Sequence, residues 1–412
     1  MSGRLGFLTA CLLFVGVALV LASAPAVAKT PHVEFHGIAV TERRVLTEDG
    51  ATLSLVELAG NDDGAVVVIQ PGLVETAQTF DDMASYFHGR GFKVILMQSR
   101  YVGRGAYRSQ LSPTADNGLE DILLKDTAAA WRYVLRRLPA GRKFHVIGHS
   151  KGGMQILAAL NQPALAAEFA SHIATATLLA APDRIEDVPV YVREICKRLI
   201  PWLERMHRGG VRAIDVHHGI FGQLKGLKDA GALGGFIARL IERPVALIAH
   251  EVMIGVLLSR FTSSRETRRL VRQEISAFPV KLLLDFARAV VTGRLPVPMS
   301  GAALTVPTQV FSAEYDLLVR TWHQRDLFIS LNNVPREGLD GERQRRWVIM
   351  EDTHHVDPVV SKRLGAVMLP LMLEFMADPA AAATRARMID ITRVEVEAVS
   401  RTQCRLMLMP AV

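Results

Sequence analysis

Cysteine and aromatic residues are scarce in this chain of 412 residues, which has three cysteines and only 6% aromatic residues. Three cysteines are too few for the disulfide framework that holds small secreted domains together. The sequence also lacks runs of basic residues interleaved with aromatic ones, so we expect no nucleic-acid partner despite a formal net charge of +7. The positive charge favours an anionic surface or a lipid headgroup as a neighbour instead.

Charge is limited in total as well, because 22% of the residues are charged while 50% are hydrophobic. This composition excludes a disordered chain or a low-complexity scaffold and leaves ample apolar material for a core. The length is large for one compact domain and small for three. A single α/β domain with one large insertion fits as well as two separate domains.

The N-terminus has the layout of an export signal. Arg4 is the only charged residue before Lys29, an apolar stretch runs from Leu5 to Ala22, and residues 26–28 form the small-x-small pattern A-V-A. We therefore expect residues 1–28 to be a signal peptide. An uncleaved anchor is the alternative, because the apolar stretch is just long enough to span a membrane. A lipoprotein modified at Cys11 is disfavoured, because the apolar stretch continues past it. In each case we expect the folded part to be exported, either to the periplasm or out of the cell. If the segment is an uncleaved anchor, the exported part stays attached to the membrane.

Removal of this segment leaves two cysteines, Cys196 and Cys404. In an oxidising compartment they could form a disulfide, and two buried free thiols are an equally good interpretation.

Apolar runs alternate with helical patterns through the first half of the chain. Continuous apolar runs predict strands buried on both faces of a sheet, and the segments between them carry apolar residues at helical spacing. This alternation predicts a doubly wound, mostly parallel α/β sheet. The expected strands are 65–69, 92–97, 143–147 and 173–179, and the expected helices lie around 80–87, 121–138 and 154–160.

The alternation stops near Pro182 and resumes near Val306. The residues between contain no convincing strand and predict helices at Val190–Met206, Leu233–Leu240, Val245–Leu258 and Val280–Val291. Beyond them we expect strands at Thr308–Phe311 and Trp347–Met350 and a long helix at Pro358–Met376. The predicted organisation is therefore a core in two parts, 29–182 and 306–378, a helical cap at 183–305 and a C-terminal extension at 379–412.

A serine between an expected strand and an expected helix is the strongest chemical signal. Residues Gly148–Gly152 have the sequence G-H-S-K-G, a match to G-x-S-x-G. The pattern alone is weak, because short motifs occur by chance. Here it follows the strand Lys143–Ile147 and precedes an apolar helix, which is the context that a nucleophile elbow requires. We therefore predict that Ser150 is a nucleophile rather than a helix N-cap.

A serine hydroxyl needs a general base, and the base needs an orienting acid. Asp316 comes just after the strand at 308–311, and His354 and His355 come just after the strand at 347–350. Both positions are carboxyl ends of strands, where an open α/β sheet presents its functional groups. The sequence therefore offers a complete set of serine, acid and histidine in that order.

These features resemble the α/β-hydrolase superfamily and, within it, most closely the acid lipases, the gastric and lysosomal lipase group. The resemblance covers most of the core and only thinly the cap, and it implies an α/β-hydrolase fold with a large helical cap inserted before the acid-bearing strand. The matching stretches are Thr47–Gly50, Val66–Leu73, Gly91–Arg108, Gly148–Gly152, Phe278–Gly293, Val306–Leu318 and His355–Pro358.

The resemblance also assigns roles to individual residues. An H-x-D pattern marks the family's catalytic histidine, which favours His355 over His354, and the position of Asp316 is that of the acid. Asp183, after the preceding strand, is the fallback acid and Glu314 a weaker alternative.

The oxyanion hole is expected to use two backbone N–H groups, those of Leu73 and Lys151. The sequence departs from the family here, because Pro71-Gly72 stands where His-Gly is usual. Proline removes its own N–H but not that of Leu73. The lysine beside the nucleophile is also unusual. Its side chain is most simply solvated, and the alternative is that it favours an anionic substrate.

A metal site is the rival use of the adjacent histidines, His217-His218 or His354-His355 with Asp357. Adjacent histidines point to different faces of a regular element, and no third ligand at fixed spacing is evident. We therefore expect neither a metal nor another cofactor.

The sequence thus predicts an exported serine hydrolase of carboxylic esters, acting on a small-molecule or lipid ester. The cap would supply an apolar acyl pocket. Either the cap or an N-terminal anchor would make a peripheral membrane contact. An acyltransferase or a polyester depolymerase would use the same residues. A hydrolase-like binding module with an inert triad is the alternative from a different class.

Overall fold

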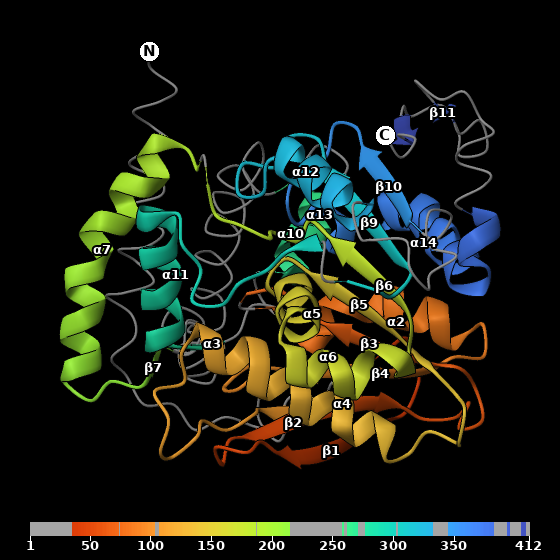
Figure 1. Ribbon diagram of the computed structural model, residues 1–412, viewed down its shortest axis with the longest axis horizontal. Coiled ribbons are helices and arrows are strands. Elements are labelled where there is room, and N and C mark those ends of the chain that lie inside the picture. The colour runs from red at the N-terminus through yellow and green to blue at the C-terminus, as the bar shows by residue number, and fades with distance from the viewer. Residues whose placement is uncertain are drawn as a thin grey trace, which may run out of the picture.

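The computed structural model of the protein describes residues 35–73, 75–103, 107–186, 188–214, 258, 262–270, 277–301, 304–332, 345–382, 394–395 and 405–408. These residues are built around one ten-stranded sheet in the order β1-β2-β4-β3-β5-β6-β9-β10-β12-β11 (Figure 1). The six central strands, from β4 to β10, run parallel, and β2 and β12 pair antiparallel with them at the two sides. The predicted fold, a mostly parallel α/β sheet, is confirmed.

The elements of the core follow the predicted alternation of strands and helices. Its strands are β1 (Val40–Leu46), β2 (Thr52–Leu58), β3 (Val66–Gln70), β4 (Lys93–Gln98), β5 (Phe144–His149), β6 (Ile173–Leu179), β9 (Thr308–Ala313), β10 (Arg345–Met350), β11 (Val394–Glu395) and β12 (Arg405–Leu408). Its helices are η1 (Ala77–Phe80), α2 (Asp81–His88), α3 (Leu119–Asp121), η3 (Ile122–Asp126), α4 (Thr127–Leu135), α5 (Lys151–Asn161), α6 (Pro163–Phe169), η4 (Ala170–His172), α12 (Thr321–Asn332), α13 (Asp357–Val360) and α14 (Lys362–Ala377).

The central strands are apolar because both of their faces are covered by helices. Alternate side chains of β3 enter two different cores, with Val67 and Ile69 on one face and Val66 and Val68 on the other. Helices α2 and α14 supply the first core, and α4, α5 and α12 supply the second. Each valine or isoleucine fully buried in this way contributes about 1.5–3 kcal/mol to folding.

The cap is represented by two long helices, α7 (Val190–Arg208) and α11 (Val280–Thr292), which lie side by side at one end of the sheet (Figure 1). They occupy the predicted ranges Val190–Met206 and Val280–Val291. The helices predicted at Leu233–Leu240 and Val245–Leu258 lie outside the described residues, except for Leu258. Among the described cap residues, a third helix is α10 (Ser264–Arg269), which contains Arg265, Arg268 and Arg269.

The structure corrects three details of the predicted elements. The cap contains a short antiparallel ladder of β7 (Ala213–Ile214) and β8 (Phe278–Pro279), which is too short to show a period in the sequence. The helix expected at 121–138 is interrupted by a π-helical turn, η3. The long helix expected at Pro358–Met376 is two helices, because Ser361 between them has an extended backbone.

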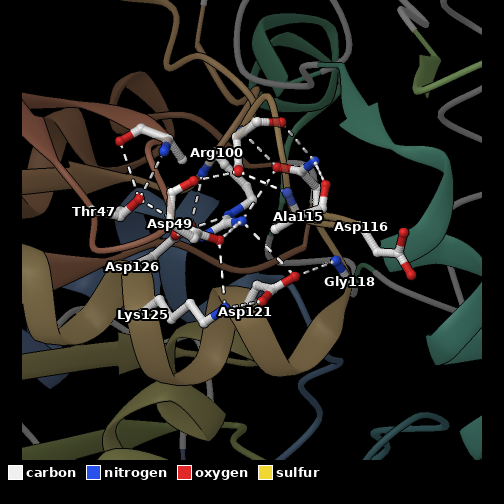
Figure 2. A network of polar contacts seen from close by, with 12 residues as sticks. Thr47, Asp49, Arg100, Ala115, Asp116, Gly118, Asp121, Lys125 and Asp126 are labelled. Carbon is white, nitrogen blue, oxygen red and sulfur yellow. Dashed lines mark hydrogen bonds and ion pairs between the residues drawn. The ribbon is translucent and has the colours of Figure 1, made fainter.

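A fully buried arginine joins three segments on one side of the sheet (Figure 2). Arg100 follows the end of β4, and its Nη2 and Nε donate to the Asp126 carboxylate at 2.7 and 2.9 Å. Its Nη1 donates to Asp49 in the β1–β2 turn at 2.9 Å and to Asn117 at 3.2 Å. The Arg100 guanidinium therefore holds the end of β4, the turn between the first two strands and η3 together.

In the described part of the chain, no helix is both long enough and apolar enough to cross a membrane. The predicted signal segment, residues 1–28, lies outside the described residues.

Replacing Asp126 by alanine leaves the buried Arg100 cation without its main partner. We expect this change to lower the free energy of unfolding by about 3–5 kcal/mol. Glu168→Ala is the matched control, because Glu168 pairs with Arg132 at 2.7 Å where both side chains are more than a third exposed. Its effect should be about 1 kcal/mol or less. Urea unfolding followed by circular dichroism measures both, and equal losses in the two variants would contradict the role assigned to Arg100.

Candidate active site

Ser150 stands on a sharp turn between β5 and α5. Its φ and ψ are 49° and −115°, a conformation that non-glycine residues seldom adopt and that is typical of a nucleophile elbow. Its backbone N–H donates to the Leu179 carbonyl of β6 at 2.9 Å, which holds the turn at the carboxyl edge of the sheet.

The two motif glycines are required by the close approach of backbones at this turn. A side-chain carbon on Gly148 would overlap the backbone of Gly152 and Gly153, and one on Gly152 would overlap the backbone of Gln70 at the end of β3. The first turn of α5 therefore packs directly against the end of β3 and the loop that follows it.

The structure brings Ser150, His355 and Asp316 together. The His355 Nε2 lies 2.8 Å from the Ser150 Oγ, and its Nδ1 lies 2.7 Å from the Asp316 Oδ2. A carboxylate only accepts hydrogen bonds, so Nδ1 carries the proton and Nε2 is free to accept the serine proton. All three side chains are buried, Ser150 being 8% exposed.

The three residues come from the carboxyl ends of three parallel strands: β5, β9 and β10. Asp316 lies in the turn after β9, and its second oxygen accepts the backbone N–H groups of Leu318 and Val319, both at 2.8 Å. These two bonds hold the carboxylate in the orientation that it presents to His355. The edge of the sheet therefore assembles Asp316 and His355, 39 positions apart, with Ser150, which is 205 positions from His355.

The alternative residues have other partners. His354 lies against the Tyr315 ring, and its backbone N–H donates to Asp357 at 2.7 Å. The Glu314 carboxylate accepts the backbone N–H of Asp352 at 2.9 Å. Asp183 lies near Arg184, and its burial raises the pKa of its carboxyl to about 6. The hydrogen-bond contacts to Ser150 and Asp316 are made by the two ring nitrogens of His355 and not by His354.

The loop expected to complete an oxyanion hole lies beside the nucleophile. Because Gly152 packs against the backbone of Gln70 and Pro71, the segment leading to Leu73 runs along the first turn of α5. The first N–H groups of a helix have no acceptor within it, and Lys151 is the first residue of α5. The backbones of Leu73 and Lys151 therefore belong to two segments that meet next to Ser150.

The expectation that the Lys151 side chain is solvated was wrong. The side chain is buried, and its Nζ donates to the Ser99 Oγ at 2.6 Å and to the Gln155 Oε1 at 3.3 Å. Burial lowers its pKa to about 8. The Lys151 side chain therefore extends into the protein, toward Ser99 after the end of β4.

Sequence reasoning assigned no role to Glu75 or to the His149 side chain, yet both lie directly behind these residues. The His149 Nδ1 lies 2.9 Å from the Glu75 Oε2, and its Nε2 lies 2.9 Å from the backbone carbonyl of His355. In the sequence, Glu75 is marked only by its position shortly after the expected oxyanion loop. An acidic residue at such a position is too common to indicate a role.

No cluster of three or more metal-ligating side chains occurs among the described residues. His217 and His218 lie outside them. Cys196 is a half-buried thiol whose pKa is raised to about 11 by burial. Its proposed disulfide partner, Cys404, also lies outside the described residues.

Known structures share this architecture at low sequence identity. A thermophilic esterase from Thermogutta terrifontis superimposes with a TM-score of 0.52 at 18% identity, over 82% of this chain and 99% of the esterase. The α/β hydrolase GrgF from Penicillium sp. sh18 gives a TM-score of 0.52 at 16% identity, over 84% of this chain and 100% of GrgF. At such identities the likeness concerns the fold alone.

Comparison with curated proteins finds no match to the sequence. Residues 61–336 do match the family described as serine aminopeptidase, S33. This range contains the elbow, the cap and Asp316. The narrower kinship with acid lipases stays a prediction. The fold and this match together show that the chain belongs to the serine aminopeptidase S33 family of α/β-hydrolases.

Proposed function

We propose that the protein is a serine hydrolase that cleaves carboxylic esters through an acyl-enzyme. The observation that carries the proposal is the continuous set of contacts from Asp316 through His355 to the Ser150 Oγ, at 2.7 and 2.8 Å. A buried histidine held in one tautomer by a carboxylate and in contact with a serine hydroxyl is the arrangement that makes serine a nucleophile.

The reaction follows from this geometry in two halves. The Ser150 Oγ attacks the ester carbonyl carbon while its proton passes to the His355 Nε2, and Asp316 stabilises the imidazolium that results. The negative charge on the former carbonyl oxygen is received by the N–H groups of Leu73 and Lys151. His355 then gives the proton to the departing alcohol oxygen as the C–O bond breaks. In the second half a water molecule replaces the alcohol and releases the acid and the free serine.

An apolar acyl group is the substrate part that the surroundings favour. Leu73 of the oxyanion loop packs against an apolar cluster that includes Met154 of α5, Leu203 of α7 and Phe278 of β8. The cap helices therefore bring hydrophobic side chains to the loop beside the nucleophile. Binding sites for hydrophobic ligands are lined in this way, with a few polar groups at the reacting end.

The alternatives differ in what attacks the acyl-enzyme or in which bond is cleaved. An acyltransferase would use an alcohol in place of water, and a polyester depolymerase would accept a polymeric ester. The family description raises a third possibility, an aminoacyl amide as substrate. An inert binding module is disfavoured, because such a module has no need of a buried histidine in contact with both a serine and an aspartate.

Ser150→Ala removes the nucleophile, and we expect it to lower kcat/KM by about 10⁴-fold or more. The substrates are p-nitrophenyl esters from acetyl to palmitoyl, with alanine p-nitroanilide as the amide. Ser171→Ala, a change at an exposed serine in η4, is the matched control and should retain full activity. A fluorophosphonate probe should label wild type and Ser171→Ala but not Ser150→Ala.

The profile across substrates separates the candidates. Turnover that rises with acyl chain length supports a lipase-like enzyme, and a short-chain optimum indicates a general esterase. Cleavage of the anilide without cleavage of esters would favour a peptidase. Folded wild type that neither turns over nor reacts with the probe would refute the enzyme and leave the binding module.

We also propose that the protein is exported through residues 1–28, and that the exported enzyme meets its ester at a lipid surface. Cell fractionation with mass analysis of the N-terminus tests the first part. Cleavage after Ala28 should yield a mature chain that begins at Lys29. Replacing Ala26 and Ala28 by leucine should block cleavage and retain the chain in the membrane fraction. A full-length chain confined to the cytoplasm would contradict export.

A further inference from the structure

A second buried pair of a histidine and a carboxylate lies directly behind the three residues of the candidate site. His149 is 1% exposed and Glu75 is 6% exposed. The His149 ring lies 5.2 Å from the His355 ring, centroid to centroid, and the Phe80 ring flanks it on another side. The side-chain hydrogen bonds of the pair go to each other, to the His355 carbonyl and to the Gly72 N–H, and not to the side chain of Ser150 or Asp316, so the pair is not part of the proton path from serine.

The hydrogen bonds of His149 fix how many protons the pair holds. The His149 Nε2 faces the backbone carbonyl of His355, which only accepts, so Nε2 carries a proton. The Nδ1 faces the Glu75 Oε2, which also accepts the backbone N–H of Gly72 at 2.6 Å. At 2.9 Å one proton must lie between Oε2 and Nδ1, because two lone pairs would repel each other. We assign this proton to the ring, which makes the pair an imidazolium and a carboxylate.

The electrostatics of the pocket agree with this count. Burial disfavours the charged ring, but the Glu75 carboxylate, the His355 carbonyl and the Asp316 charge outweigh burial and raise the pKa of His149. Another charged group nearby is the buried Lys151 on α5, on which the Glu75 and Asp126 charges act. The His355 ring, 5.2 Å from the His149 ring, is a further titratable neighbour.

The pair joins three segments that must keep their relative positions during hydrolysis. Glu75 holds Gly72, the residue before the oxyanion donor Leu73. His149 ends β5 immediately before Ser150, and its ring holds the backbone of His355 after β10. A side-chain carbon on Gly72 would lie 2.7 Å from the Glu75 Oε2 and 3.0 Å from the His149 Nδ1, so glycine is needed there for the pair to form.

We propose that Glu75 and His149 are positioning residues that align the oxyanion loop with His355 only while the pair holds its proton. This inference rests on the proposed function, because it names what aligns that site. When His149 loses a proton, its Nε2–H can remain on the His355 carbonyl, but the bare Nδ1 then faces the Glu75 carboxylate. Two acceptors repel, Glu75 moves, and the Gly72 N–H loses its partner.

The sign of the pH effect follows from this order of events. His149 holds its proton below its raised pKa and loses it as the pH rises through that pKa, so alignment is lost on the alkaline side. We expect kcat to fall along a one-proton alkaline limb while KM changes little, because the oxyanion donors act on the transition state.

The decisive variants are Glu75→Ala and Glu75→Gln. Glu75→Ala removes the acceptor of Gly72 and should lower kcat by about 10- to 100-fold. In the wild type both contacts fall on one oxygen, Oε2. In Glu75→Gln the amide must turn so that its oxygen accepts the Gly72 N–H while its nitrogen donates to a neutral Nδ1. This variant should recover most of the activity lost in Glu75→Ala and should lack the alkaline limb. Glu168→Gln, a change in the ion pair on α6, should keep the wild-type profile.

Lys151 is the rival source of an alkaline limb, and Lys151→Gln separates the two. The limb should persist in Lys151→Gln. A limb that disappears in Lys151→Gln but remains in Glu75→Gln would overturn the proposal, as would a flat wild-type profile up to pH 10. A purely structural role for Glu75 would lower activity without changing the shape of the profile.

A measurement without catalysis keeps this proposal distinct from the proposed function. In Ser150→Ala protein labelled with ¹⁵N-histidine, the His149 ring, assigned by its absence in His149→Asn, should carry two N–H protons at pH 7. In the double variant Ser150→Ala/Glu75→Gln, the His149 ring should carry one N–H proton. A neutral His149 ring at pH 7 in the Ser150→Ala protein overturns the positioning role. If wild-type protein shows the expected ring signals but does not react with the fluorophosphonate probe, the proposed ester hydrolase is refuted and the protonated His149–Glu75 pair is not.

Discussion

The contact between the first turn of α5 and the end of β3 is the constraint on which the candidate site depends. Gly152 lies so close to Gln70 that no side chain fits between the two backbones, and a side chain on Gly148 would likewise overlap the first turn of the helix. This contact forces Ser150 into its positive-φ conformation and lifts its side chain to the edge of the sheet. The same contact brings the loop with Leu73 beside the N-terminus of α5.

Charged groups buried around this contact hold the surrounding loops in place. Arg100 ties the end of β4 to η3 on one side, and the Glu75–His149 pair ties the oxyanion loop to the His355 backbone on the other. Lys151 lies between them and donates to Ser99. A buried charge is costly unless it is paired or hydrogen-bonded, so each of these groups stays in place only while its partners do. These buried contacts therefore fix the geometry of the loops that carry the functional residues.

Most of the core could be predicted because its signals are local. The apolar runs at β3, β4, β5 and β6 are buried on both faces of the sheet, so their composition reports their environment directly. The motif around Ser150 was recognisable because the turn itself demands glycine on both sides. Asp316 and His355 could be named as candidates because each directly follows an apolar strand. The choice of His355 over His354 came from a resemblance, and the structure now places His355 against Ser150.

The sequence by itself therefore determined the strands, their alternation with helices and the interruption by a cap. It also determined which serine, Ser150, is the candidate nucleophile. These features depend on residues that are neighbours in the chain. Only the tertiary structure decided that His149 faces Glu75, that Lys151 points inward and that Arg100 is enclosed by Asp126 and Asp49. Each of these contacts joins side chains from different strands and loops, apart from the Lys151 bond to Gln155 within α5. The direction of a charged side chain is set by which partner can compensate its burial, and that partner is chosen by the packing of the sheet.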